Sequence, residues 1–212
     1  HGYGLSYADG FTTRTEPVTV LDTPTEIEEV DPMEGTNYTK GLFKDGVYVN
    51  DYAGIKMNIP GEFRQFSDTE LAEVKNGTLS QCVEDEDIAR ESAKCYDSFF
   101  LGNYDYISFE FLNTVLGMTD NLDCTEEEYL DALKTYLTGL FTEVGGVIEY
   151  EDRVKVTISG KEYVREVARI TMQGQEQYDY FYVRKLDDNL ISIIEINGIS
   201  DKSPEYFEEM FN

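Results

Sequence analysis

Apolar and polar positions alternate along most of the second half of the chain. Between residues 147 and 197 the apolar side chains recur at every second position, as in residues 154–158, and turn residues such as Ser159-Gly160 separate the runs. A period of two is typical of half-buried strands. The pattern predicts an antiparallel meander. Its last strand, residues 191–196, is apolar on both faces, so we expect it to be central and covered by helices on both sides.

Two helices are predicted from their first residues. Thr125 precedes three consecutive glutamates, whose charge suits a helix N-terminus, and apolar residues then follow at three- and four-residue steps as far as Val144. Ser67 and Glu70 have the spacing of a capping box, which predicts a short helix over residues 68–75. The longer helix has one broad apolar stripe, so we expect it to lie across a sheet.

The remaining segments complete the order of elements. Residues 46–60 read as two short strands around Ala53-Gly54, and residues 94–101 and 106–112 as a hairpin in which Phe109 and Phe111 alternate with Ser108 and Glu110. Residues 81–94 fit either a short helix or a loop. Ser203 and Pro204 begin a final helix. This order predicts an α+β fold, an antiparallel β-sheet covered by helices in an α/β/α sandwich.

The first 45 residues differ in composition from the rest of the chain. They hold Pro17, Pro24 and Pro32, many threonines and acids, and few periodic apolar residues. We interpret residues 1–45 as an N-terminal tether or extended arm and residues 46–212 as a single α+β domain. The alternative is that Val18–Val20 adds an edge strand to the domain. A tether suits a protein held at a surface, which favours an extracytoplasmic, secreted or cell-surface location.

A family resemblance supports this organisation. Tyr52-Ala-Gly-Ile-Lys-Met-Asn-Ile-Pro60, then Phe63, then Ser67-x-x-Glu-Leu71 resembles the start of the Mog1/PsbP-like fold, and Ser203-Pro-Glu-Tyr-Phe-Glu-Glu-Met-Phe211 is similar to its closing helix. The resemblance covers residues 46–212. It implies a binding or assembly module, often exported and lipid-anchored in bacteria, without a shared catalytic centre. Phe63 stands where an exposed tryptophan is common, residues 81–94 are an acidic insertion, and no functional residue of the family transfers to a position here.

The net charge of the chain limits the classes of molecule that it is expected to bind. The chain has 212 residues with 43 acidic and 17 basic side chains, a net charge of −26. Such a chain does not neutralise phosphates, so we expect no nucleic-acid partner. No apolar run of about 18 residues occurs, so we expect no transmembrane segment, although a lipid anchor upstream of the sequence is compatible with it. The acidity also favours a monomer.

The residues that enzymes use for covalent catalysis are scarce. The only histidine is His1, and Cys82, Cys95 and Cys124 have no C-x-x-C spacing, although Cys82 and Cys95 could pair in an exported protein. The acids gather at turns and helix starts rather than as a marked catalytic pair, and no complete calcium-loop pattern occurs. We therefore expect no enzyme activity, no cofactor and no specific metal site.

One sheet surface carries the residues most suited to a ligand or a partner. Tyr178, Tyr180 and Tyr182 share a strand face, and Arg165 and Arg169 belong to a basic stretch between residues 153 and 185. If the face is open, the tyrosines form a stacking platform; if another element covers it, they are core. Likewise the arginines either bind an anionic partner or pair with acids of the chain.

These observations favour a non-catalytic extracytoplasmic binding or assembly module whose partner is a protein or a cell-envelope component. The alternative is a small-ligand binding protein for a carbohydrate or a divalent cation, with a cleft near the tyrosine strand or near residues 81–94.

Overall fold

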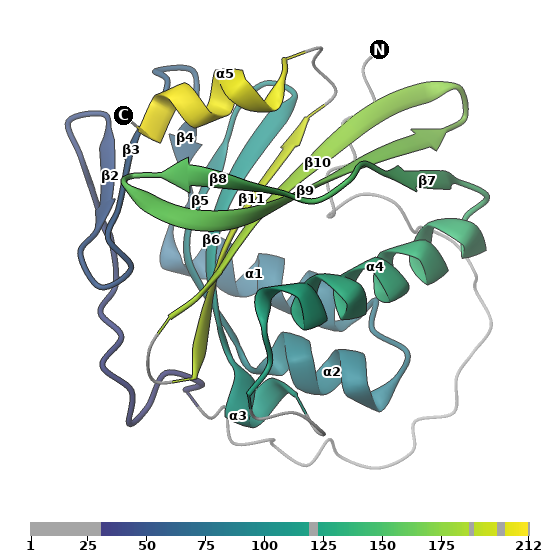
Figure 1. Ribbon diagram of the computed structural model, residues 1–212, viewed down its shortest axis with the longest axis horizontal. Helices are drawn as coiled ribbons and strands as arrows, with labels where there is room; N and C mark the ends of the chain where they lie inside the picture. Colours follow the sequence, from purple (N-terminus) through teal and green to yellow (C-terminus); the bar gives the residue numbers. More distant parts are fainter. Residues whose placement is uncertain (1–30, 119–122, 187–188, 199–201, 212) are drawn as a thin grey trace.

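The centre of the structure is an antiparallel sheet with the strand order β4-β5-β6-β11-β10-β9-β7 (Figure 1). The computed structural model describes residues 31–118, 123–186, 189–198 and 202–211. Strands β7 and β8 pair with different parts of β9. The strands of this sheet are β4 (Arg64–Gln65), β5 (Lys94–Leu101), β6 (Asp105–Asn113), β7 (Val147–Tyr150), β8 (Val154–Ile158), β9 (Lys161–Met172), β10 (Gln175–Lys185) and β11 (Leu190–Gly198).

One face of this sheet packs against helices. Helix α4 contacts β7, β9 and β10, and α1 contacts β5. We call this side the helix face; Leu130, Leu133 and Leu137 of α4 pack there with Phe181 and Ile193 of the sheet. The helices of the chain are α1 (Asp68–Leu79), α2 (Asp85–Ser92), α3 (Thr114–Gly117), α4 (Glu126–Glu143) and α5 (Pro204–Glu208), with the 3₁₀ helix η1 at Glu209–Phe211.

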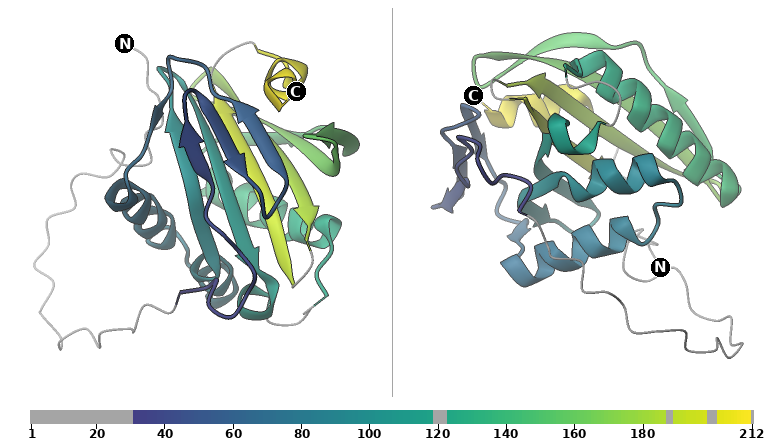
Figure 2. Two further views of the ribbon diagram at one scale, coloured as in Figure 1. Left: turned by 90° about the vertical axis from the view of Figure 1, so that its left-hand side faces the viewer. Right: turned by 90° about the horizontal axis from the view of Figure 1, so that it is seen from below.

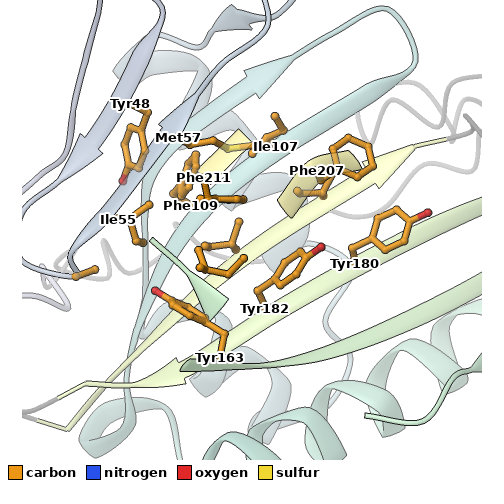
Figure 3. Close-up of a cluster of buried hydrophobic side chains, with 14 of the residues drawn as sticks. Tyr48, Ile55, Met57, Ile107, Phe109, Tyr163, Tyr180, Tyr182, Phe207 and Phe211 are labelled. Carbon is orange, nitrogen blue, oxygen red and sulfur yellow. The ribbon is translucent and has the colours of Figure 1, made fainter. Parts of the chain in front are cut away.

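The opposite face is covered by a second sheet and by the C-terminal segment (Figure 2). This sheet contains β1 (Leu42–Lys44), β2 (Val47–Asn50) and β3 (Ile55–Asn58) in that order. Tyr48 stacks on Phe109 of β6 with ring centroids 3.9 Å apart, and Ile55 and Met57 lie in the same buried cluster (Figure 3). We call this side the small-sheet face.

The α+β class and the antiparallel sheet predicted from the sequence are confirmed. Strand β11 is central, between β6 and β10. Helices lie on both faces, as predicted, but on the small-sheet face α5 and η1 share the cover with β1–β3. The two strands predicted over residues 46–60 are present, and alternation places the apolar side chains of β3 on the main sheet.

The ambiguous segment 81–94 contains a helix, α2, with Asp85, Glu86 and Asp87 in its first turn. The helix predicted over residues 68–75 continues to Leu79. None of the helices in the described part of the chain is both long and apolar enough to span a membrane.

Residues 31–45, which were predicted to belong to the arm, pack against the domain. Met33 is buried, the Tyr38 hydroxyl donates a hydrogen bond to Asp97, and β1 pairs with β2. Few apolar residues anchor this stretch, and much of its attachment is polar, so apolar periodicity does not reveal that it packs against the domain. The rest of the proposed arm, including Val18–Val20, lies outside the described residues, so its tethering role stays a prediction.

Candidate functional site

A cavity of about 500 Å³ opens on the helix face, and we call it the helix-face cavity. It lies where α1 and α2 on one side and α4 on the other leave part of the sheet uncovered. Its lining includes Val74, Gly77 and Thr78 of α1, Arg90 and Glu91 of α2, Lys94, Tyr96 and Phe99 of β5, Tyr106 and Glu110 of β6, Leu133, Tyr136 and Leu137 of α4, Phe181 of β10 and Glu195 of β11.

The sheet places two carboxylates beside each other in this cavity. Glu195 pairs across the strands with Ser108, and Glu110 pairs with Ile193. Directly opposed residues of antiparallel strands share a face, so Glu110 and Glu195 occupy diagonal positions on the helix face, on the order of 7 Å apart. The alternation that directs Phe109 and Phe111 into the small-sheet face therefore directs Glu110 into the cavity.

Lys94 is the cation that pairs with Glu110. Its Nζ lies 3.2 Å from Glu91 Oε2 and 3.3 Å from Glu110 Oε2. Burial alone would lower the pKa of Lys94, but Glu91 and Glu110 outweigh that effect and hold the pKa well above its ordinary value. Lys94 is therefore charged and shared between two acids.

Glu110 is almost fully buried, with 2% of its surface exposed. Ser108 donates a hydrogen bond to its Oε1 at 2.8 Å. Its Oε2 faces Lys94 as an ion pair but accepts no hydrogen bond of good geometry. Burial raises the pKa of Glu110 even though Lys94 opposes the shift.

Glu195 has a different environment. The Tyr106 hydroxyl donates a hydrogen bond to it, but no ion pair reaches Glu195 from the residues that the structure describes. Burial, and then the charges of Glu110 and Asp179, raise the pKa of Glu195 to about 8. At neutral pH most of this carboxyl group is therefore protonated.

Within the described ranges, no group of three or more His, Cys, Asp and Glu side chains is arranged to hold a metal ion.

The tyrosines singled out from the sequence lie on the small-sheet face, opposite the cavity. Tyr180 and Tyr182 are buried beneath the C-terminal segment, at 4% and 0% exposure, and their hydroxyls donate hydrogen bonds to the carbonyls of Lys202 and Pro204 (Figure 3). Tyr178 is half-buried and stacks on Tyr180. Another element covers this strand face, so Tyr180 and Tyr182 pack as core residues and do not form an open stacking platform.

The two arginines singled out with them are paired within the chain. Arg165 contacts Glu208 at 2.7 Å, and Arg169 contacts Glu149 and, at 3.7 Å, Glu176. The role of these five residues as a ligand or partner surface stays a prediction.

The sequence indicated part of the cavity, through the alternative cleft near residues 81–94, but not the sheet residues Glu110 and Glu195 that line it. The clearest signal was Glu195, a lone acid within a strand that is otherwise apolar on both faces. Such a carboxylate is buried unless the strand lies at an edge, and burial without a cation marks a functional candidate. Lys94 and Glu110 gave no such signal, because alternation with apolar residues looks the same on a covered face as on an exposed one.

The three cysteines are free thiols. Cys82 lines the cavity, Cys95 lies near Tyr38 on the small-sheet face, and Cys124 is buried beside α4. The pairing of Cys82 with Cys95, left open from the sequence, is not formed. Burial raises the pKa of Cys82, so its thiol is protonated at neutral pH.

Comparison with known proteins gives only distant similarity. No protein-family model matches the chain, and no curated protein matches it. Among solved structures, it is similar to the solution structure of PsbP (CyanoP) from Synechocystis, with 10% identity over 84% of this chain and 90% of that chain and a TM-score of 0.45.

A crystal structure from Bacteroides thetaiotaomicron is also similar, with 11% identity, a TM-score of 0.40 and coverage of 81% of this chain. The chain spans 46% of that protein's length.

Proposed function

We propose that this protein is a non-catalytic binding domain that holds a small ligand in the helix-face cavity. The observation that carries the proposal is a cavity of about 500 Å³ whose largely apolar wall surrounds a few convergent polar groups, Lys94, Glu110 and Glu195. Cavities of this size and composition are typical of small-molecule sites. Of the two kinds of binding considered from the sequence, this geometry favours the small ligand over a macromolecular partner.

The chemistry of the lining supports binding rather than catalysis. A nucleophilic cysteine needs a lowered pKa, but the pKa of Cys82 is raised. A nucleophilic lysine must lose its proton, but Glu91 and Glu110 keep Lys94 charged. The groups that could attack a substrate are therefore held in their unreactive forms.

We also propose that the domain works outside the cytoplasm, attached through its N-terminal segment. The composition of residues 1–45 and the charge of −26 support this location. Fractionation of the native host, with detection of the protein in the envelope or the medium, tests this location, and recovery only with cytoplasmic markers would contradict it.

The test of the binding proposal uses a residue at which the cavity can be filled. A Cβ atom at Gly77 would meet no atom within 4 Å, and Gly77 lines the cavity. We therefore expect Gly77→Phe to occupy the space that the ligand needs. Gly139 of α4 offers the matched control, because its Cβ would also meet nothing within 4 Å but the residue is exposed and outside the lining.

Thermal unfolding is measured with a panel of small aromatic and aliphatic compounds of positive, neutral and negative charge. We expect at least one compound to raise the Tm of the wild type and of Gly139→Phe in a concentration-dependent manner, because it binds only the folded state. The same compound leaves the Tm of Gly77→Phe unchanged. Equal shifts in both variants, or no shift with any compound, would overturn the proposed site.

A further inference from the structure

The charges inside the cavity point to the class of ligand, an inference that rests on the proposed function. We propose that the ligand carries a positively charged amine on an apolar body, with the amine placed between Glu110 and Glu195 and the body against the apolar part of the wall.

The first observation is an imbalance of charge. Three acidic side chains in the lining, Glu91 of α2, Glu110 of β6 and Glu195 of β11, are called the inner carboxylates. Lys94 pairs with Glu91 and with Glu110. The other basic residue of the lining, Arg90, pairs with Asp87. The three acids therefore have one cation, Lys94, among them, and Glu195 has no ion-pair partner among the described residues. A ligand cation would let Glu195 ionise and would give it that partner.

The second observation is a buried oxygen whose need for a donor is poorly met. Glu110 Oε2 is in a side chain that is 98% buried, and its one nearby donor is Lys94 Nζ at 3.3 Å, in a geometry that does not make a good hydrogen bond. A buried acceptor in this state is costly. An ammonium group has three N–H donors and could serve Glu110 Oε2 and Glu195 together.

The apolar part of the wall fits the rest of such a ligand. Phe99, Leu133, Leu137 and Phe181 line the same cavity as the inner carboxylates. An aromatic or aliphatic group bound there leaves water while its amine reaches the sheet. An anionic ligand is disfavoured, because Lys94 is already shared by two acids and the whole chain carries a charge of −26.

We expect the binding of an amine to release a proton from Glu195. The charged and titratable groups that face Glu195 are Tyr106 and Glu110 of β6, Asp179 of β10 and Lys94 of β5. Burial, together with the acids Glu110 and Asp179, keeps the Glu195 carboxyl protonated at neutral pH before a ligand binds. An ammonium beside it favours the carboxylate, so binding releases a proton to the buffer.

The experiment compares three probes of similar shape, 2-phenylethylamine, 2-phenylethanol and 3-phenylpropanoate, by isothermal titration calorimetry on the full chain at pH 7. We expect the amine to bind at least tenfold more tightly than the alcohol or the carboxylate. In buffers of different ionisation enthalpy, we expect amine binding to release up to one proton.

The variant Glu195→Gln tests the contribution of the Glu195 carboxylate to amine binding. We expect it to weaken amine binding at least tenfold and to abolish proton release, while 2-phenylethanol binds as it does to the wild type, which also shows that the cavity is intact. Glu73→Gln removes the same charge at an exposed position of the lining, and we expect it to change amine affinity less than threefold.

The outcomes separate the two proposals. If the alcohol or the carboxylate binds as tightly as the amine, or if Glu195→Gln leaves amine affinity unchanged, the charge inference is wrong while the binding site stands. If none of the three probes binds, or if Gly77→Phe binds the amine as the wild type does, the site itself is wrong and the inference fails with it.

Discussion

Asp97 shows how one residue can join two layers of the fold. The pairing of β5 with β6 shifts between Tyr96 and Ser98, and Asp97 lies at this bulge. Its side chain is fully buried and accepts hydrogen bonds from the hydroxyls of Tyr38 and Tyr48 and from the Gly41 amide, at 2.5, 2.6 and 2.8 Å. The carboxylate therefore fastens the small sheet and residues 31–41 to β5.

We predict that Asp97→Asn lowers the free energy of unfolding by about 2–4 kcal/mol, because an amide replaces one accepting oxygen with a donor that faces other donors. Urea unfolding measures the change. Asp51→Asn makes the same substitution at an exposed turn residue, and we expect it to change stability by less than about 0.5 kcal/mol. A loss below that value for Asp97→Asn would show that the network contributes little.

Glu195 gives the stability of the protein a pH dependence of known sign. Its pKa is about 8 in the folded protein, against an ordinary value of 4.5. Between these pH values the folded state keeps a proton that the unfolded chain releases, so this group lowers stability as the pH rises from about 4.5 to about 8. The effect is at most about 1.4 kcal/mol per pH unit.

We predict that Glu195→Gln flattens the dependence of unfolding free energy on pH between pH 5 and pH 8, measured by urea unfolding at several pH values. Glu86→Gln, at an exposed position in α2, serves as the control and leaves the slope as in the wild type. Parallel pH profiles for the wild type and Glu195→Gln would show that Glu195 is ionised in the folded state.

The surroundings of individual side chains were the feature of the structure that the sequence predicted least well. The alternation in β6 correctly predicts that Phe109 and Glu110 point to opposite faces. It does not say that both faces are covered, because a period of two records which residues share a face and not what lies above them. Asp97 was also missed, since a bulge interrupts the alternation without a glycine or proline to mark it.

Helix ends were the most predictable features at the scale of elements. Capping boxes are present at both predicted sites, Ser67 with Glu70 and Thr125 with Glu128. Each satisfies backbone N–H groups that a helix start would otherwise leave without partners. Local side-chain chemistry of this kind needs no knowledge of distant parts of the chain, which is why the sequence reveals it.

We predict that Thr125→Ala lowers the free energy of unfolding by about 1 kcal/mol, because the cap of α4 loses its acceptor for the Glu128 amide. Thr135→Ala removes the same atoms from an exposed position within α4, and we expect it to be neutral or slightly stabilising. Chemical unfolding of the two variants compares them directly. Equal losses would contradict a role for the cap.

The sequence does not distinguish a helix from a loop at α2, because the start of this helix has no side-chain cap. Glu84 holds the N-cap position without a capping hydrogen bond. Three acids in the first turn and the burial of Arg90 and Glu91 support the helix instead. These contacts come from the rest of the fold, so the segment could not be assigned locally, although it supplies one wall of the helix-face cavity.

At the scale of the whole molecule, the two faces of the main sheet have different roles. The small-sheet face is filled by aromatic side chains, including Tyr180 and Tyr182, beneath β1–β3 and the C-terminal segment. The helix face is covered less completely and contains the cavity. The sequence predicted a sheet with helices on both faces, but neither the second sheet nor this division, since the site depends on how far apart α1, α2 and α4 lie across the main sheet.

The central claim is that the helix-face cavity, and not the tyrosine face, receives the ligand. Two-dimensional ¹H–¹⁵N NMR during titration with 2-phenylethylamine and 2-phenylethanol tests it most directly, because the two candidate surfaces lie on opposite faces of the sheet. We predict saturable chemical-shift changes at Thr78, Cys82 and Tyr96, with the amides of Arg165 and Tyr178 unaffected. Saturable changes confined to Arg165, Tyr178 and their neighbours, or no saturable change with either compound, would contradict the account.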